Sequence, residues 1–114
     1  RDIATMLEQS KSFNPARARR IAQTETSRTI NFARQASFEE MSNQASQVGI
    51  ELNLAKEWIT SATRARPLHE RLDGQIVGLN EEFRVEHYHS LTPGGFGVGA
   101  MDINCRCTIR SVFL

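Results

Sequence analysis

The sequence predicts an α+β fold, in which a long N-terminal helix packs on a small antiparallel sheet with an inserted helical turn. Residues 16–47 contain neither glycine nor proline, whereas the seven glycines all follow residue 48. The second half consists of short segments of strand-forming residues bounded by turn residues. This change divides the chain into a helical arm with the long helix (1–49) and a small mixed portion (50–114) that completes a single domain.

The long helix has clear start and stop signals. Asn14 can cap it, Pro15 suits the first helical position, and Gly49 follows its expected end. Apolar residues fall near helical spacing and predict the face that packs on the sheet: Ala18, Ile21, Ala22, Phe32, Ala33, Ala36 and Met41. Glu25 interrupts this stripe, so we expect it to make a polar contact with the second half.

The second half predicts short strands around one helical turn. We expect strands in "AKEWITS", "QIVGL" and "EFRVEHYH", with the helical turn in "ARPLHERLDG" opened by Pro67. The loop "TPGGFGVGA" is predicted to be flexible and to lead directly into the last strand. In that strand, "CRCTIRSVFL", alternation places four residues on one face: Cys105, Cys107, Ile109 and Phe113.

The net charge of the chain is too small to attract nucleic acid or a membrane by itself. Fourteen Lys and Arg against thirteen Asp and Glu give a net charge of +1. A local cluster in the first third is either a solvated basic face or a surface for an acidic protein or DNA: Arg17, Arg19, Arg20, Arg28 and Arg34. No apolar run approaches the roughly 20 residues needed to span a bilayer, so we expect no membrane partner.

Histidines and cysteines form two closely spaced pairs that could ligate a metal. "HYH" and "CRC" each project two side chains from one face of a strand, and another histidine lies in the helical turn. The candidate ligands are Cys105, Cys107, His69, His87 and His89. Two interpretations remain open: a structural zinc site, or no cofactor, with the cysteines as small buried residues.

A second candidate site lies in the helical turn. His69 stands near Arg66 and Asp73, an arrangement suited to general acid–base chemistry on a phosphate substrate. It suggests a small metal- or histidine-dependent nuclease or a toxin-like domain. Nothing in the sequence marks a nucleophile, so a protein without catalytic residues is the favoured interpretation.

Three blocks in order resemble one known family. "RARRIAQTETSRTIN", "KEWITSATRARPLHERLDGQIVGLNEEF" and "DINCRCTI" are similar to the phage Mu F-like head morphogenesis family, in its C-terminal domain, from about Arg17 to Ile109. The resemblance implies a minor head protein of tailed phages and prophages, bound to the portal protein or other head proteins. It further implies a role at the portal vertex in head assembly and in DNA packaging or ejection, within the virion or the host cytoplasm during assembly.

The resemblance also groups polar residues from separate blocks. It implies one buried network that joins the long helix to the helical turn and the cysteine segment: Thr24, Glu25, Arg28, Asn31, His69, Asp73 and Asn104. Two departures from the family pattern qualify this. Ala62 and Thr63 stand where the family commonly has an acidic residue, and His87 and His89 lie outside the pattern.

Overall fold

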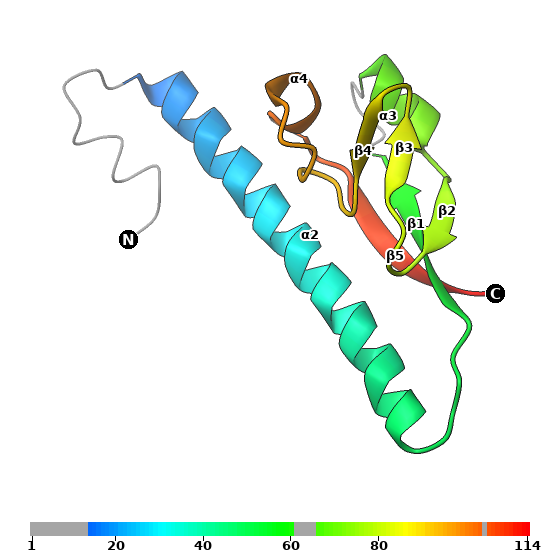
Figure 1. Cartoon of the computed structure of the whole chain (residues 1–114). Helices are drawn as coiled ribbons and strands as arrows, with labels where there is room; N and C mark the ends of the chain where they lie inside the picture. Colours follow the sequence, from blue (N-terminus) through cyan, green and yellow to red (C-terminus); the bar gives the residue numbers. More distant parts are fainter. Residues whose placement is uncertain (1–13, 61–65, 104) are drawn as a thin grey trace.

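The computed structural model describes residues 14–60, 66–103 and 105–114 and confirms the α+β arrangement (Figure 1). Ala62, Thr63 and Asn104 lie outside the described residues. The elements are α2 (Pro15–Gln47), β1 (Leu54–Ile59), α3 (Pro67–Leu72), β2 (Ile76–Gly78), β3 (Phe83–Val85), β4 (Tyr88–Ser90), α4 (Gly99–Asp102) and β5 (Thr108–Phe113). Within the described ranges, no helix has both the length and the apolar character needed to cross a membrane.

Local signals set the ends of α2 as predicted. The Asn14 Oδ1 atom accepts a hydrogen bond from the Arg17 backbone N–H at 3.1 Å, and Pro15 occupies the first turn. After Gln47 the chain turns at Gly49, whose φ of +81° favours glycine. The 33 residues form a helix about 50 Å long that lies alongside β5 (Figure 1).

The sheet places β1 at its centre, between β2 and β5, with both pairs antiparallel. Trp58 on β1 is opposite Ile109 on β5. The segment "EFRVEHYH", expected as one strand, instead forms the hairpin β3–β4. The chain reverses at Glu86, which adopts the left-handed region with φ of +54°, so a single strand was the wrong prediction.

The core lies between the sheet, α3 and the segment leading into β5. Trp58 is fully buried and meets the Phe83 ring edge-on, with centroids 5.3 Å apart. Cys105, Cys107 and Ile109 are buried as expected, although β5 itself begins only at Thr108. Phe113 corrects the alternation prediction. It lies at the end of β5 opposite Leu54, and 67% of its surface is exposed.

The face of α2 that contacts the sheet differs from the predicted stripe. Phe32, Ala33, Ala36 and Met41 are exposed, whereas the buried residues of the helix are Ala18, Asn31 and Gln35. Ala18 of the predicted stripe is buried, but the prediction was wrong from Phe32 onward, because the neighbouring segments present polar groups to this helix: the carbonyl oxygens of Cys107 and Leu79 and the Lys56 ammonium. Buried polar groups need hydrogen-bond partners, so polar side chains occupy that face.

The glycine-rich loop packs against α2 and contains the short helix α4, so it does not lead directly into a strand. Gly94 is buried with φ of +82°, and an added Cβ would lie 3.2 Å from the Arg28 Cα atom. The glycine therefore permits both an unusual backbone conformation and a close approach of the loop to the helix.

Gly94→Ala is expected to lower the free energy of unfolding by about 2 kcal/mol or more, because a left-handed alanine is strained and its methyl group would press on the α2 backbone. Gly97→Ala is the matched control. Gly97 has φ of +77° but nothing within 4 Å of an added Cβ, so it carries only the backbone cost of about 1 kcal/mol. Urea denaturation of both variants measures the difference, and equal losses would contradict the packing role of Gly94.

Candidate functional site

A polar seam, defined here as Asn31, Gln35 and Lys56, joins α2 to the sheet. The Asn31 side-chain amide donates a hydrogen bond to the Cys107 carbonyl oxygen at 2.9 Å. Its Oδ1 atom accepts one from the Thr108 hydroxyl at 3.1 Å. Asn31 is 1% exposed, so these bonds satisfy groups that water does not reach and fix the helix against the start of β5.

Lys56 is the buried cation of the seam. Its Nζ atom donates to the Gln35 Oε1 atom at 3.0 Å and to the Leu91 carbonyl oxygen at 2.7 Å. It also lies 5.3 Å from the centre of the Phe83 ring. Burial lowers the pKa of Lys56 from 10.5 to about 8, against the opposing effect of the Glu39, Glu81 and Glu82 carboxylates.

This shift predicts that the protein becomes more stable as the pH rises through about 8. Between that value and 10.5 the unfolded chain still binds the Lys56 proton while the folded chain has released it, so the free energy of unfolding increases with pH. From about pH 7 to about pH 9.5, wild type is expected to gain about 1–2 kcal/mol relative to Lys56→Met. Denaturant melts of both proteins at the two pH values test this, and a constant difference would contradict it.

A second buried group, the thiol cluster, consists of His69, Cys105 and Cys107. One ligand atom from each lies within 4.8 Å of the other two. α3 presents His69 inward, where it is 2% exposed, with Nε2 2.9 Å from the Met101 carbonyl oxygen and Nδ1 3.7 Å from Cys107 Sγ. Because a carbonyl only accepts, Nε2 of the neutral ring carries the proton and the Nδ1 lone pair faces the thiol.

The two thiols of the cluster titrate as a pair. The hydrogen bond between them lowers the pKa of Cys107 and raises the pKa of Cys105, so the first proton leaves Cys107. Burial opposes the shift at Cys107. When the cluster loses a proton, Cys107 therefore releases it first, although both cysteines are nearly inaccessible to solvent.

The structure brings only part of the expected polar network together. His69 and Asn31 both reach Cys107, through its side chain and its carbonyl oxygen. Glu25 does not join them: its Oε1 atom lies 3.8 Å from Arg28 Nη1, and both side chains are nearly half exposed. Such a pair contributes under about 1 kcal/mol.

The other expected members of that network lie apart from the thiol cluster. Thr24 donates from its hydroxyl to the Arg20 carbonyl oxygen at 2.8 Å, within α2. Asp73 accepts a hydrogen bond from the Thr60 backbone at 2.9 Å.

In the expected acid–base site, Arg66 donates to the Ile103 carbonyl oxygen. Arg66 and Asp73 thus have structural partners, and the ring nitrogens of His69 point into the protein, so the structure does not present the three as an open acid–base site.

His87 and His89 stand away from the cysteines in the β3–β4 hairpin. His89 Nδ1 lies 2.9 Å from Glu82 Oε2, and the His87 ring packs at a tilt against Tyr88 with centroids 4.1 Å apart. Both histidines are exposed. Of the five candidate metal ligands, the structure gathers His69, Cys105 and Cys107 and leaves these two outside.

The clustered arginines are exposed but do not form one strip. At 100° per residue, Arg17 and Arg28 lie toward one side of α2, Arg19 and Arg34 lie toward another, and Arg20 lies between the two groups, so the five spread over about half of the helix circumference. Arg28 also lies over the Phe32 ring, 5.4 Å from its centre. The arginines therefore do not give α2 one continuous face for binding phosphate groups.

Sequence reasoning missed Gln35 and Lys56. Lys56 shares a strand face with Leu54 and Trp58, both of them buried. Its position between two core residues of one strand was the sequence signal that Lys56 is buried. Gln35 gave none, because its burial depends on the Leu79 carbonyl oxygen and the Lys56 ammonium, which are distant in sequence.

The chain matches the family described as Phage Mu protein F like protein over residues 1–110. It belongs to this Mu F-like family. The match spans the helix, the seam and the thiol cluster. No solved structure is significantly similar to the chain.

Two curated relatives contain a similar region. One is the NAD(+)–arginine ADP-ribosyltransferase EFV of Enterococcus faecalis (strain ATCC 700802 / V583), 35% identical over 112 residues, which cover 97% of this chain and 22% of that protein. The other is the Minor head protein GP7 of Bacillus phage SPP1, 30% identical over 109 residues, which cover 94% of this chain and 33% of that protein. The Mu F-like chain spans about a fifth and a third of their lengths.

Proposed function

We propose that this Mu F-like chain is the head-binding part of a phage or prophage minor head protein. The observation that carries the proposal is the similarity to a minor head protein over 94% of the chain, within a family match that covers residues 1–110. Its partners are other head proteins, with the portal protein foremost. Its place of action is the portal vertex during head assembly and DNA packaging or ejection, first in the host cytoplasm and then in the virion.

The two relatives differ in name but share this region. One is named as a minor head protein and the other as an ADP-ribosyltransferase, and each resembles nearly the whole of this chain. We infer that the shared region performs a common task of attachment, whatever the rest of each protein does. The enclosed His69 ring supports this inference over the nuclease-like alternative, because a catalytic histidine must reach its substrate.

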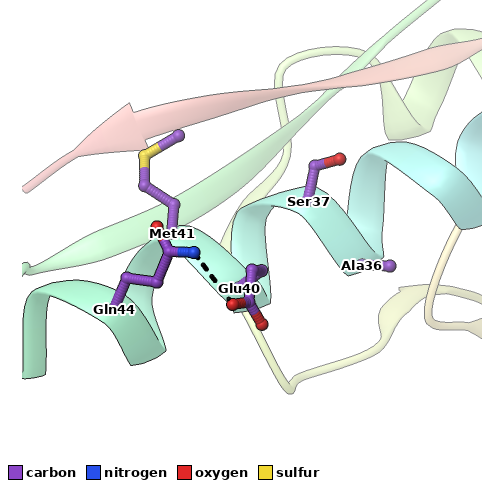
Figure 2. Close-up of a pocket in the computed structure, with 5 residues that line it drawn as sticks. All are labelled: Ala36, Ser37, Glu40, Met41 and Gln44. Carbon is purple, nitrogen blue, oxygen red and sulfur yellow. Dashed lines mark hydrogen bonds between the residues drawn. The ribbon is translucent and has the colours of Figure 1, made fainter. Parts of the chain in front are cut away.

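The surface that best suits such an attachment is the outer face of α2, which we define as Ala33, Ala36, Ser37, Glu40, Met41 and Gln44. Five of these side chains line a groove on successive turns of the helix, where Gln44 donates a hydrogen bond to Glu40 at 3.0 Å (Figure 2). All six are exposed, on the side opposite the seam. Small side chains with one exposed methionine suit close packing of an element from another head protein.

Recovery of the protein with assembled phage heads tests the proposal. Wild type is expected to remain with heads purified after nuclease treatment. Ala36→Arg should fold normally but fall about tenfold in recovery, the change that a loss of about 1.4 kcal/mol of binding produces. Glu70→Arg, an exposed change on α3, is the control and should be recovered like wild type.

Each contrary result has a distinct meaning. Normal recovery of Ala36→Arg would reject the outer face of α2 as the docking surface. Loss of wild type on nuclease treatment would show attachment through DNA. Absence of the wild-type protein from heads under all conditions would contradict the proposed function itself.

A further inference from the structure

The thiol cluster has the composition of a soft-metal site. It combines one imidazole with two thiols, the ligand types that bind zinc. His69, Cys105 and Cys107 are 2%, 1% and 3% exposed, and their ligand atoms lie within 4.8 Å of one another. They come from α3 and from the segment before β5, so one ion would connect two parts of the chain that are more than 30 residues apart.

The distance between two of the ligand atoms fits tetrahedral zinc. With a Zn–S bond of about 2.3 Å and a Zn–N bond of about 2.0–2.1 Å, nitrogen and sulfur at two corners of a tetrahedron lie about 3.6 Å apart. His69 Nδ1 and Cys107 Sγ are 3.7 Å apart. The two atoms are therefore as far apart as two corners of a zinc tetrahedron.

The surroundings of the cluster prepare His69 as a ligand. Its Nε2–H group donates to the Met101 carbonyl oxygen at 2.9 Å, which directs the Nδ1 lone pair toward the cysteines. Ligating histidines in metal sites almost always have their second nitrogen held in this way. The backbone position of Cys107 is fixed as well, by the hydrogen bond from Asn31 to its carbonyl oxygen.

The indole of Trp58 supplies an independent observation. Its Nε1–H group is buried, and the described residues offer it no acceptor at hydrogen-bond distance. An unpaired buried donor is costly, and such groups are few in folded proteins. The indole packs against the His69 ring, with centroids 5.9 Å apart, so this unpaired donor lies beside the thiol cluster.

We propose that His69 Nδ1 and the thiolates of Cys105 and Cys107 bind one Zn²⁺ ion. Binding releases two protons, one from each thiol, and the two thiolate charges balance the charge of the ion. The three residues occupy three of the four corners of the tetrahedron. The ion fastens α3 to the segment that leads into β5, so its role is structural, and the burial of both sulfurs keeps them from acting as nucleophiles.

Metal content of the whole chain, purified under reducing conditions and dialysed after addition of Zn²⁺, tests this proposal. Wild type is expected to retain one zinc per chain and to melt at a higher temperature than the chelator-treated protein. Cys107→Ser and His69→Asn should each lower the retained zinc at least about tenfold, the effect of losing about 1.4 kcal/mol of binding. His89→Asn, an exposed histidine outside the cluster, should retain one zinc.

Cobalt substitution keeps the test decisive if a variant fails to fold. Addition of Co²⁺ to the wild-type chain should produce the intense near-ultraviolet absorption of cobalt bound to thiolate, with a weaker band for Cys105→Ser. Folded wild type without this band and without retained zinc would overturn the proposal. A Cys105–Cys107 disulfide found in the native protein by mass spectrometry would also overturn it, and neither result would affect the proposed attachment to heads.

Discussion

Trp58→Ala is expected to lower the free energy of unfolding by about 3–5 kcal/mol, a large part of the net stability of a domain of this size. Trp58 is fully buried on the central strand and contacts three ring systems. Its centroid lies 5.3 Å from Phe83, 5.9 Å from His69 and 6.0 Å from Phe96. Alanine would leave a cavity between the sheet and α3, and the rings around it belong to separate elements that cannot all move inward.

Trp58→Phe is the matched control for the size of that cavity. It keeps an aromatic ring and removes the indole N–H group, which has no acceptor at hydrogen-bond distance among the described residues. We therefore expect a clearly smaller loss than for alanine. Equilibrium urea denaturation of both variants gives the two values, and similar losses would contradict the central position of this ring in the core.

Gln35→Leu is expected to cost about 2–3 kcal/mol at neutral pH, because it leaves buried polar groups without partners. Lys56 would lose one of its two oxygen acceptors, and the Leu79 carbonyl oxygen would lose the donor that lies 2.6 Å away. Gln44→Leu changes the same residue type at an exposed position of the same helix. Its loss should stay within about 0.5 kcal/mol.

A double-mutant cycle separates the seam from simple packing. In Gln35→Leu/Lys56→Met the buried charge is removed together with its acceptor, so the combined loss should be smaller than the sum of the single losses by at least about 1 kcal/mol. Thermal or urea melts of the four proteins measure this coupling. Strict additivity would show that the contact between Gln35 and Lys56 does not contribute to the stability of the seam.

The parts of the fold that depend on local chemistry were predictable from the sequence. Asn14, Pro15 and Gly49 act within one turn of the helix end that each defines, and Pro67 opens α3 in the same way. The burial of Cys105, Cys107 and Ile109 followed from strict alternation. The same alternation failed at Phe113, because the pattern does not reveal where the core beneath a strand ends.

The orientation of α2 was not predictable from its own residues. Apolar spacing favoured Phe32 and Met41 for the buried face, whereas Asn31 and Gln35 occupy it. The choice depends on the carbonyl oxygens of Cys107 and Leu79, which are placed by strands far along the chain. An amphipathic pattern ranks the faces of a helix by apolar content alone, so it misplaces a helix that packs through hydrogen bonds.

The candidate site was likewise predictable from the sequence only in part. The C-x-C spacing predicted two cysteines on one face, and the histidine of the helical turn meets them in the structure. The "HYH" pair was an equally plausible ligand pair by spacing. It lies elsewhere because the chain reverses at Glu86, whose left-handed backbone conformation neither composition nor periodicity indicated.

The face that α2 buries also links the fold to the proposed function. Because Asn31 and Gln35 occupy the face of α2 that packs on the sheet, Ala33, Ala36 and Met41 are left on the surface, where a partner can bury them. The central claim is therefore that the outer face of α2 contacts another protein of the phage head.

Photo-cross-linking within assembled heads tests that claim most directly. Met41→Cys places an accessible thiol on the outer face, and Ile76→Cys places one on β2, at the edge of the sheet opposite β5 (Figure 1). Each introduced thiol is labelled with benzophenone maleimide, a photo-cross-linker. Cys105 and Cys107 are buried and should not react with this reagent. We predict cross-links to another head protein from position 41 and none from position 76. Cross-links from position 76 alone, or from neither position in heads that contain the protein, would contradict the claim.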